Sequence, residues 1–341
     1  MPNPRWKQRP ERSNWGDFGP DDQIGRLNLI TPEVVLKGIA EVQLGQTFCL
    51  SLPLNLPGGN ALSQHRHPPR LQPTERDRHA LYNMSVNALM PGHTDVLCDD
   101  AVLLHTQYST QWDSLAHVGQ LFDVDGTGVR TAVYYNGYRA GVDIIGPDDA
   151  QGRAVGARAL GIETMAQKAI QSRGVLLDLF SLFGRQRHYV GYDDLMKCIE
   201  RAAVEPESGD ILCLYTGFAD VVMEMNGNPD GKTLETSCAV LDGRDERLQR
   251  WIVDSGIAAL CADNYAVEGL PATASACVPC ALLPLHELCL FRYGIPLGEL
   301  WYFRDLARSL GAAGRSRFLL TAPPLRLPGA VGSPVTPVAT I

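Results

Sequence analysis

The chain has 341 residues, of which 45% are hydrophobic and 20% charged, a composition typical of a folded globular protein rather than a disordered one. Its formal charge of −8, without a dense run of Lys or Arg, argues against nucleic acid and anionic membranes as main partners, so we expect a small-molecule substrate. No stretch approaches the roughly 20 apolar residues of a membrane span.

The first 20 residues are charged, interrupted by proline and without an apolar core of signal-peptide length. Nine cysteines, an odd number, are scattered along the chain. This distribution is typical of thiols in a reducing compartment rather than of a disulfide framework. Together these features predict a cytoplasmic protein.

The first predicted helix follows Thr31 and Pro32, a capping residue with proline at the first helical position. We assign residues 1–46 to an N-terminal strap and this helix. Residues 47–140 contain short extended pieces and turns, and helices are scarce there. Within them, the polar stretch 63–78 is typical of an exposed loop.

Helical patterns and apolar runs of strand length alternate in the second half, which predicts a mixed α/β fold. Helices are expected at 163–172, 193–203 and 244–254, and strands at 175–180, 211–216 and 257–262. We expect a single domain over residues 1–341, with a β/α body at 47–320 and an irregular C-terminal strap at 321–341 packed back on it.

The stretch QYSTQWDSLAH, residues 107–117, carries polar side chains that could do chemistry. Gln107, Gln111 and Asp113 are separated by even numbers of residues, so in an extended chain they project from one face and the aromatic residues between them from the other. A helix would scatter them around its circumference. The pattern predicts a strand with a polar face. The alternative is an amphipathic strand whose amides simply face water.

Three other motifs could carry chemistry, and each has a simpler structural interpretation. Cys277 and Cys280 could be a redox pair or half of a zinc site, but no second such pair exists and the apolar neighbours favour buried structural thiols. His286 opens a HELCL segment without the second histidine of the zincin motif, which favours a hydrogen-bonding role within the body. His65 and His67 lie in the polar loop, as solvated residues or as part of a lid over a pocket.

The 107–117 stretch resembles the HxGTHxDxPxH signature of the cyclase family, which includes bacterial kynurenine formamidase and isatin hydrolase. Gln107 and Gln111 stand where the first two histidines are, whereas Asp113 and His117 match the aspartate and the last histidine. The resemblance implies a swivelling β/β/α fold of the α/β class and a homodimer or homotetramer. Further segments resemble the family in family order along nearly the whole chain: WGDFGPDDQIGRLNLITPE, GDILCLYTGF, CADNYAVEG, LHELCLFRYGIPLGELW and GAVGSPVTPVA.

In the family's hydrolases, the two histidines and the aspartate bind a zinc or manganese ion that activates water, and the last histidine moves the proton. The resemblance therefore implies a metal site at Gln107, Gln111 and Asp113, with His117 as the proton carrier. A glutamine carbonyl is a weaker zinc ligand than imidazole and suits a harder ion such as manganese. We therefore expect a weakly held divalent metal, manganese or zinc, or none.

Three functions stay open on the sequence. The first is a hydrolase that opens a cyclic amide or lactone, or cleaves a small amide, with His117 as general base and then acid, and Asp113 orienting it or holding the metal. The two glutamines would bind substrate through its carbonyl oxygen or complete the metal site. The second is a metal-free lyase, dehydratase or cyclase of secondary metabolism, and the third a non-catalytic ligand-binding member. Glu268 and Glu299 are interpreted as structural wall residues, and no second metal site is assigned.

Overall fold

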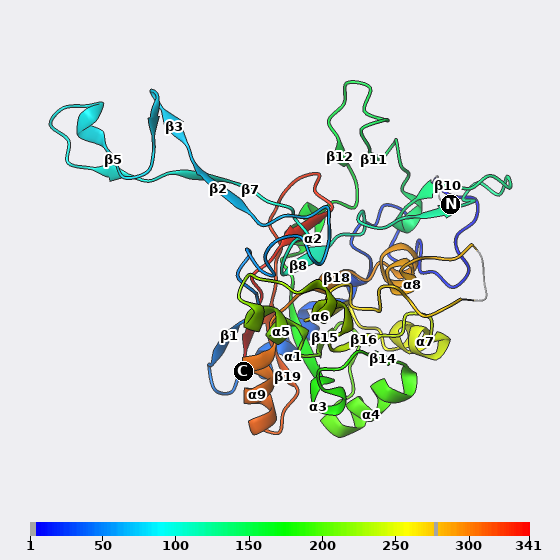
Figure 1. The fold of residues 1–341 in the computed structure, drawn as a ribbon. Coiled ribbons are helices and arrows are strands. Elements are labelled where there is room, and N and C mark those ends of the chain that lie inside the picture. The colour runs from blue at the N-terminus through cyan, green and yellow to red at the C-terminus, as the bar shows by residue number, and fades with distance from the viewer. Residues whose placement is uncertain (1–4, 276–278) are drawn as a thin grey trace.

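The computed structural model describes residues 5–275 and 279–341, and a large mixed sheet forms its centre (Figure 1). The strands of this sheet are β1 (Thr47–Cys49), β8 (Gln111–Asp113), β13 (Gln171–Asp178), β15 (Ile211–Tyr215), β17 (Ala259–Ala262), β18 (Leu297–Glu299), β19 (Arg317–Thr321), β20 (Gly332–Pro334) and β21 (Val338–Thr340). Their order across the sheet is β1-β21-β19-β13-β15-β17-β18-β8-β20. The middle strands β13, β15, β17 and β18 run parallel, and the flanking pairs are antiparallel. This confirms the predicted mixed α/β fold.

Helices cover both faces of the sheet. They are α1 (Pro32–Ala40), α2 (Ile162–Lys168), α3 (Phe180–Phe183), α4 (Tyr192–Ala202), α5 (Phe218–Met225), α6 (Gly231–Thr236), α7 (Glu246–Asp254), α8 (Pro284–His286) and α9 (Arg304–Ala312). In β13, Val175 and Leu177 enter the core that α4 and α7 cover, whereas Leu176 enters the core that α2 and α9 cover. The alternation of side chains along a strand thus builds two hydrophobic layers.

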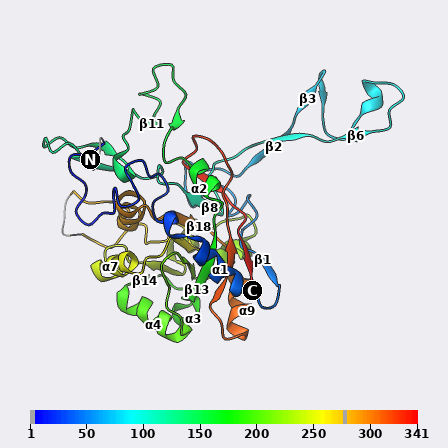
Figure 2. The same ribbon diagram turned by 180° about the vertical axis from the view of Figure 1, so that it is seen from behind.

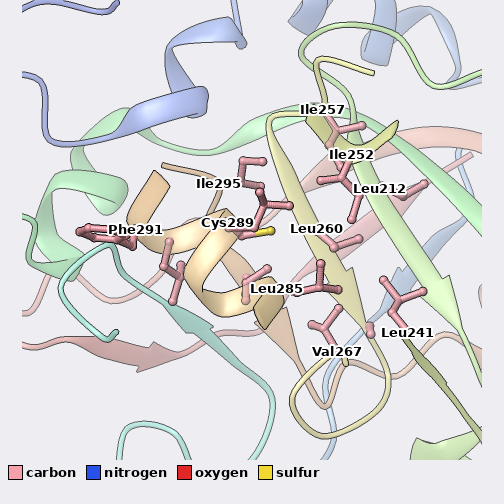
Figure 3. Close-up of a cluster of buried hydrophobic side chains, with 14 of the residues drawn as sticks. Leu212, Leu241, Ile252, Ile257, Leu260, Val267, Leu285, Cys289, Phe291 and Ile295 are labelled. Carbon is pink, nitrogen blue, oxygen red and sulfur yellow. The ribbon is translucent and has the colours of Figure 1, made fainter. Parts of the chain in front are cut away.

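The first of these layers fixes the helical segment that reaches the candidate site (Figure 3). Leu285 of α8 and Cys289 of the following π-helix η4 (Glu287–Tyr293) are fully buried against Leu260 of β17 and Ile252 of α7. Burying an aliphatic side chain of this size stabilises a fold by about 1.5–3 kcal/mol. The packing therefore holds His286, the residue after Leu285, in one place on the sheet.

Local signals account for several element ends. Thr31 caps α1 by accepting a hydrogen bond from the Val34 amide, as the sequence predicts. The helix predicted at 163–172 is wrong at its C-terminal end, because α2 stops at Lys168 and Gln171 already begins β13. There the chain pairs with β19 over five residues, and this long-range pairing outweighs local helical preference.

Residues 70–103 form an arm that projects from the body in both views (Figures 1 and 2). Its stem is a two-stranded ribbon of β2 (Arg70–Pro73) and β7 (Asp100–Leu103). The outer part holds β3 (Glu75–Arg76), β4 (His79–Ala80), β5 (Met84–Ser85), β6 (Val96–Leu97) and the short 3-10 helix η2 (Val86–Ala88). The stretch predicted as an exposed loop is thus exposed, but its second half is part of this arm.

Smaller elements complete the body. The two-stranded sheets pair β9 (Gln120–Phe122) with β10 (Thr131–Val133), β11 (Ile144–Ile145) with β12 (Gly156–Ala157), and β14 (His188–Val190) with β16 (Ala239–Leu241); the 3-10 helices are η1 (Gly25–Leu29) and η3 (Tyr135–Gly137). The C-terminal strap packs back on the body through β20 and β21. Within the described ranges, no helix combines the length and apolarity needed to cross a bilayer.

Candidate active site

β8 places Gln111 and Asp113 on one face of the sheet and Trp112 on the other. Trp112 is fully buried, and its ring centroid lies 5.1 Å from that of Trp301. β18 runs antiparallel to β8 and pairs Glu299 directly with Gln111. Since directly opposed residues project from the same face, Glu299 joins Gln111 and Asp113 there.

The strand predicted across 107–113 is shorter than expected. Only residues 111–113 are extended, because the preceding residues form turns, one of them closed by a hydrogen bond of 3.1 Å from the Tyr108 amide to the His105 carbonyl. Thr110 anchors the entry to β8 by accepting a hydrogen bond from the Leu52 amide. Gln107 is therefore carried by a turn and not by the strand face that holds Gln111.

A buried polar cluster forms around Asp113. The Gln111 amide nitrogen donates to Asp113 Oδ1 at 3.2 Å and to Glu299 Oε2 at 3.1 Å. His286, at the start of the α8–η4 segment, brings its Nε2 to 3.3 Å from Glu299 Oε1. One ligand atom each of Asp113, His286 and Glu299 lies within 4.8 Å of the other two, and all four side chains are buried.

Glu268 orients the histidine of this cluster. Its carboxylate accepts hydrogen bonds of 2.9 Å from the backbone amides of Leu285 and His286, and a further one of 2.9 Å from His286 Nδ1. The imidazole is thereby fixed with Nε2 directed toward Glu299. A histidine held through one nitrogen by a carboxylate, with the other nitrogen facing a polar site, is the arrangement common among metal-binding histidines.

The charges of the cluster are strongly coupled. Burial lowers the pKa of His286, but hydrogen bonds with Glu268 and Glu299 outweigh it and raise that pKa to about 10. Burial raises the pKa of Asp113, against the opposing effect of the nearby His117 ring. For Glu299, burial is outweighed by the hydrogen bond with His286, so its pKa is lowered. With this raised pKa, the His286 ring is an imidazolium at neutral pH and lies between Glu268 and Glu299.

Two buried oxygens in the cluster lack a partner among the described residues. They are Gln111 Oε1 and Asp113 Oδ2. Buried acceptors without a donor are uncommon in folded proteins and point to a missing ligand such as water or a cation. With two carboxylates, an amide oxygen and an oriented imidazole, the donor set suits a divalent ion that prefers oxygen ligands and tolerates nitrogen, such as manganese.

His117 stands at the open side of the cluster. Its Nε2 lies 3.8 Å from Asp113 Oδ1, and its side chain is 22% exposed while that of Asp113 is fully buried. Gln107 Nε2 contacts His117 Nδ1 at 3.3 Å, and the Thr106 hydroxyl donates to Gln107 Oε1 at 2.7 Å. Because Thr106 occupies the amide oxygen, the amide nitrogen donates to Nδ1, and the proton of the neutral ring sits on Nε2, facing Asp113.

The polar loop after β1 reaches over this open side. Arg66 donates from Nη1 to the Gln107 carbonyl oxygen at 2.7 Å, and its guanidinium lies 6.0 Å from the centroid of the Tyr265 ring. A small cavity lies between them, lined by Arg66, Gln107, Tyr108 and Tyr265 among others. His67 stays outside and pairs with His105, the two ring centroids being 5.5 Å apart.

The structure thus groups the predicted residues into two sets. Gln111 and Asp113 share the buried cluster, whereas Gln107 contacts His117. The hydrogen-bonding role predicted for His286 is confirmed, but its place in this cluster with Glu268 and Glu299, both interpreted as structural wall residues, was not predicted. Each is a charged or titratable residue inside an otherwise apolar stretch, and such a residue needs a partner when it is buried. The sequence shows these charged residues in apolar stretches, but it does not identify the residue with which each one pairs.

Of the cysteine motif, only Cys280 can be placed relative to this site. Cys277 lies outside the described residues, and Cys280 is exposed. All cysteines that the structure describes are free thiols. The prediction of buried structural thiols is therefore wrong for Cys280.

Comparison with known proteins gives one family. The family model described as "Putative cyclase" matches residues 44–269, more than half of the chain. This range contains β8, His117 and Glu268 and ends before His286. No curated protein matches the chain.

Solved structures with a similar fold cover almost the whole chain. A structure described as a novel cyclase is 27% identical, with a TM-score of 0.74, and the match covers 97% of this chain and 100% of that one. Isatin hydrolase A from Labrenzia aggregata, bound to benzyl benzoate, is 12% identical with a TM-score of 0.56, and the match covers 90% and 97%. An isatin hydrolase bound to the product analogue thioisatinate is 11% identical with a TM-score of 0.55, covering 91% and 99%. The two isatin hydrolases, at these identities, share the fold.

Proposed function

The chain belongs to the cyclase family, and from this premise we propose that it is a hydrolase that opens a cyclic amide or lactone, or cleaves a small amide. The observation that supports this most is the position of His117, partly exposed beside a buried acidic cluster in which two oxygens have no partner among the described residues. Such a site offers a proton acceptor on its open side and a place for a cation below it.

A divalent ion would be held by Asp113, His286 and Glu299, with Gln111 Oε1 as a further oxygen ligand. This set replaces the predicted one in part, since Gln107 contacts His117 and has no hydrogen bond with Asp113 or Gln111 among the described residues. When bound there, such an ion polarises a carbonyl and makes water more acidic. Glu268 keeps the His286 ring oriented for this role.

His117 moves the proton in this proposal. Its Nδ1 carries the lone pair, so it accepts the proton of the attacking water, and the Gln107 amide must move aside as it does. Asp113, beside Nε2, stabilises the resulting imidazolium. As the carbon–nitrogen or carbon–oxygen bond of the substrate breaks, the imidazolium returns this proton to the leaving nitrogen or oxygen.

A second candidate, a metal-free lyase, dehydratase or cyclase, is favoured by the position of His286. Its two ring nitrogens lie 2.9 Å from Glu268 and 3.3 Å from Glu299, so an imidazolium here supplies the positive charge that a metal would otherwise provide. Asp113 and His117 would then exchange the substrate proton without attack by water. The two candidates differ in their dependence on metal.

Elemental analysis of protein purified without added metal, paired with activity before and after chelation, separates them. If the protein is the proposed hydrolase, we expect about one divalent ion per chain and activity on small cyclic amides, lactones or acyclic amides. Chelation should abolish this activity, and added manganese should restore it. Asp113→Asn should lower the metal content. Full activity of metal-free protein would instead support the second candidate.

The role of His117 has its own test. His117→Asn should lower turnover by about two to four orders of magnitude, the usual effect of losing a general acid and base. The control is His93→Asn, an exposed histidine on the arm, which should leave turnover unchanged. Turnover that survives His117→Asn would place the proton carrier elsewhere.

A further inference from the structure

A second, larger cavity adjoins the candidate active site. Its volume is about 320 Å³, within the range of small-molecule sites. Glu268, whose carboxylate holds His286, lines this cavity, and Tyr265 lines both it and the small cavity beside Arg66 and Gln107. The larger cavity therefore borders the catalytic cluster on one side and the polar loop on the other.

Among the described residues, Arg187 lines this cavity and has no ion pair. Arg187, just before β14, donates from Nε and Nη2 to the backbone carbonyls of Leu234 and Glu235 at the end of α6. Its Nη1 makes no hydrogen bond in the described part of the chain, and no carboxylate there lies within ion-pair distance of it. Arg187 thus binds the end of α6 through Nε and Nη2, and its Nη1 is free to bind a ligand.

Asn264 supplies the second polar group. Its amide nitrogen donates to the carbonyls of Ala239 at 3.0 Å and Val267 at 3.4 Å, which fixes the orientation of the amide. Its Oδ1 is buried and accepts no hydrogen bond from the described residues. The backbone carbonyl of Asn264 accepts a hydrogen bond from the amide of Leu300, the residue after Glu299, so Asn264 lies beside the end of the strand that carries Glu299.

The remaining walls are mostly apolar, and their charge limits the ligand. Leu62, Phe218, Leu234, Val240 and Leu270 contribute hydrocarbon surface. Two acidic residues, Glu235 and Glu268, share the lining with Arg187. A phosphate or a dicarboxylate would bring two or more negative charges to one guanidinium, whereas a single carboxylate can pair with the Nη1 that the backbone carbonyls leave free.

From this arrangement we propose that the cavity binds the substrate as an apolar monocarboxylate. Its carboxylate pairs with Arg187, and an N–H group donates to Asn264 Oδ1. Placed so, the N–H of an amide lies on the side of the catalytic cluster. This inference rests on the proposed hydrolase function for the identity of the reacting amide, but the preference for a carboxylate is a property of the cavity alone.

Binding of matched acids and amides tests it. The probes are N-acetyl-L-phenylalanine, N-benzoylglycine and N-acetylanthranilate, each compared by calorimetry with its primary amide on the wild-type chain and on the inactive variant Asp113→Asn. At least one acid should bind about tenfold more tightly than its amide, the scale expected for a hydrogen bond to a charged group. The proposal is overturned if no acid binds more tightly than its amide.

Variants locate the preference. Arg187→Gln should reduce it to less than about twofold. The control is Arg185→Gln, two residues before Arg187, which removes a surface ion pair with Glu224. It should leave the preference for acids intact. Leu62→Trp, on the loop, should fill the cavity and weaken acid and amide alike, and it tests the location even if Arg187→Gln is unstable. A preference that persists in Arg187→Gln, or binding untouched by Leu62→Trp, would show that the ligand lies elsewhere.

The two proposals fail separately. An Arg187-dependent preference for acids in the Asp113→Asn variant supports the cavity assignment even if the wild-type chain hydrolyses nothing. Hydrolysis of small amides without any preference for acids supports the hydrolase proposal and overturns the cavity assignment.

Discussion

Gln111 keeps two buried carboxylates together at the base of the candidate site. Its amide nitrogen donates to both Asp113 and Glu299, which lie on adjacent strands, so one neutral donor bridges the two carboxylates. A neutral side chain thus does here what a positive charge often does elsewhere. Gln107, although the same residue type, is four residues away on a turn and serves His117 instead.

This difference predicts that the two glutamines respond differently to substitution by histidine. Gln111→His places an imidazole beside Asp113, Glu299 and His286, and zinc affinity should rise on the order of 10- to 100-fold or more, because imidazole is a better zinc ligand than an amide oxygen. Gln107→His is the matched control and should change zinc affinity little. Calorimetry with zinc measures both. Equal responses of the two variants would contradict the ligand set assigned here.

At the scale of elements, an ion-pair network joins α1, β13 and β19 near the start of β15. Glu207 receives Lys37 at 2.6 Å and Arg173 at 2.9 Å, and Arg173 also pairs with Asp210 at 2.8 Å. These hydrogen bonds, from Lys37 and then from Arg173, lower the pKa of Glu207 to about 2. The network connects segments that are far apart in the sequence, so its effect is on docking of the elements and not on any one helix.

The lowered pKa predicts how acid weakens this connection. Since the pKa of Glu207 is lower in the folded chain than its ordinary value of 4.5, its contribution is complete above about 4.5 and is lost as the pH falls toward 2. Glu207→Gln should cost less than about 1 kcal/mol of unfolding free energy at pH 7, because the side chain is 41% exposed. Urea unfolding at pH 7 and pH 3 should show the cost shrinking in acid.

Glu205→Gln is the control for this measurement, because that exposed side chain has no ion pair among the described residues. It should change stability little at either pH. A cost of Glu207→Gln that stays constant from pH 7 to pH 3 would mean that the network does not set the pKa of Glu207.

At the scale of the whole molecule, the arm leaves apolar side chains in water. Leu71 and Val102 are opposed across the β2–β7 ribbon and are 70% and 48% exposed, and Leu103 is 66% exposed. An exposed apolar ribbon of this kind is typical of an interaction surface. The arm begins just after the loop that carries Arg66 and ends just before the turn that carries Gln107. Its two ends therefore flank the candidate site.

We therefore predict that the arm packs against a second copy of the chain, in a homodimer or homotetramer. Light scattering should give a mass at least twice the 37.2 kDa of one chain. The double variant Leu71→Ser and Val102→Ser should weaken the assembly, whereas Leu121→Ser with Val129→Ser, at other exposed apolar positions, should not. A wild-type mass of 37 kDa would refute the prediction.

Residues 107–117 alone were enough to predict Gln111 and Asp113 on one face, because alternation along a strand is a local property. The same is true of α1, whose cap lies in adjacent residues, and of the alternating helices and strands of the second half. The extent of β8 could not be predicted in this way. Whether Gln107 is extended depends on turns that end only where pairing with β18 and β20 begins.

The sequence by itself therefore determined the mixed α/β class and the family resemblance. It also determined that Asp113 and His117 lie close together at the end of one strand. Only the tertiary structure decided that His286 and Glu299, 173 and 186 residues after Asp113, complete the cluster, and that Glu268 orients the histidine. The physical reason is that a buried charged group must be paired to be stable, but the order of the strands and the packing of the helices decide which residue pairs with it. Strand register and the core beneath α8 are long-range properties, and no local pattern encodes them.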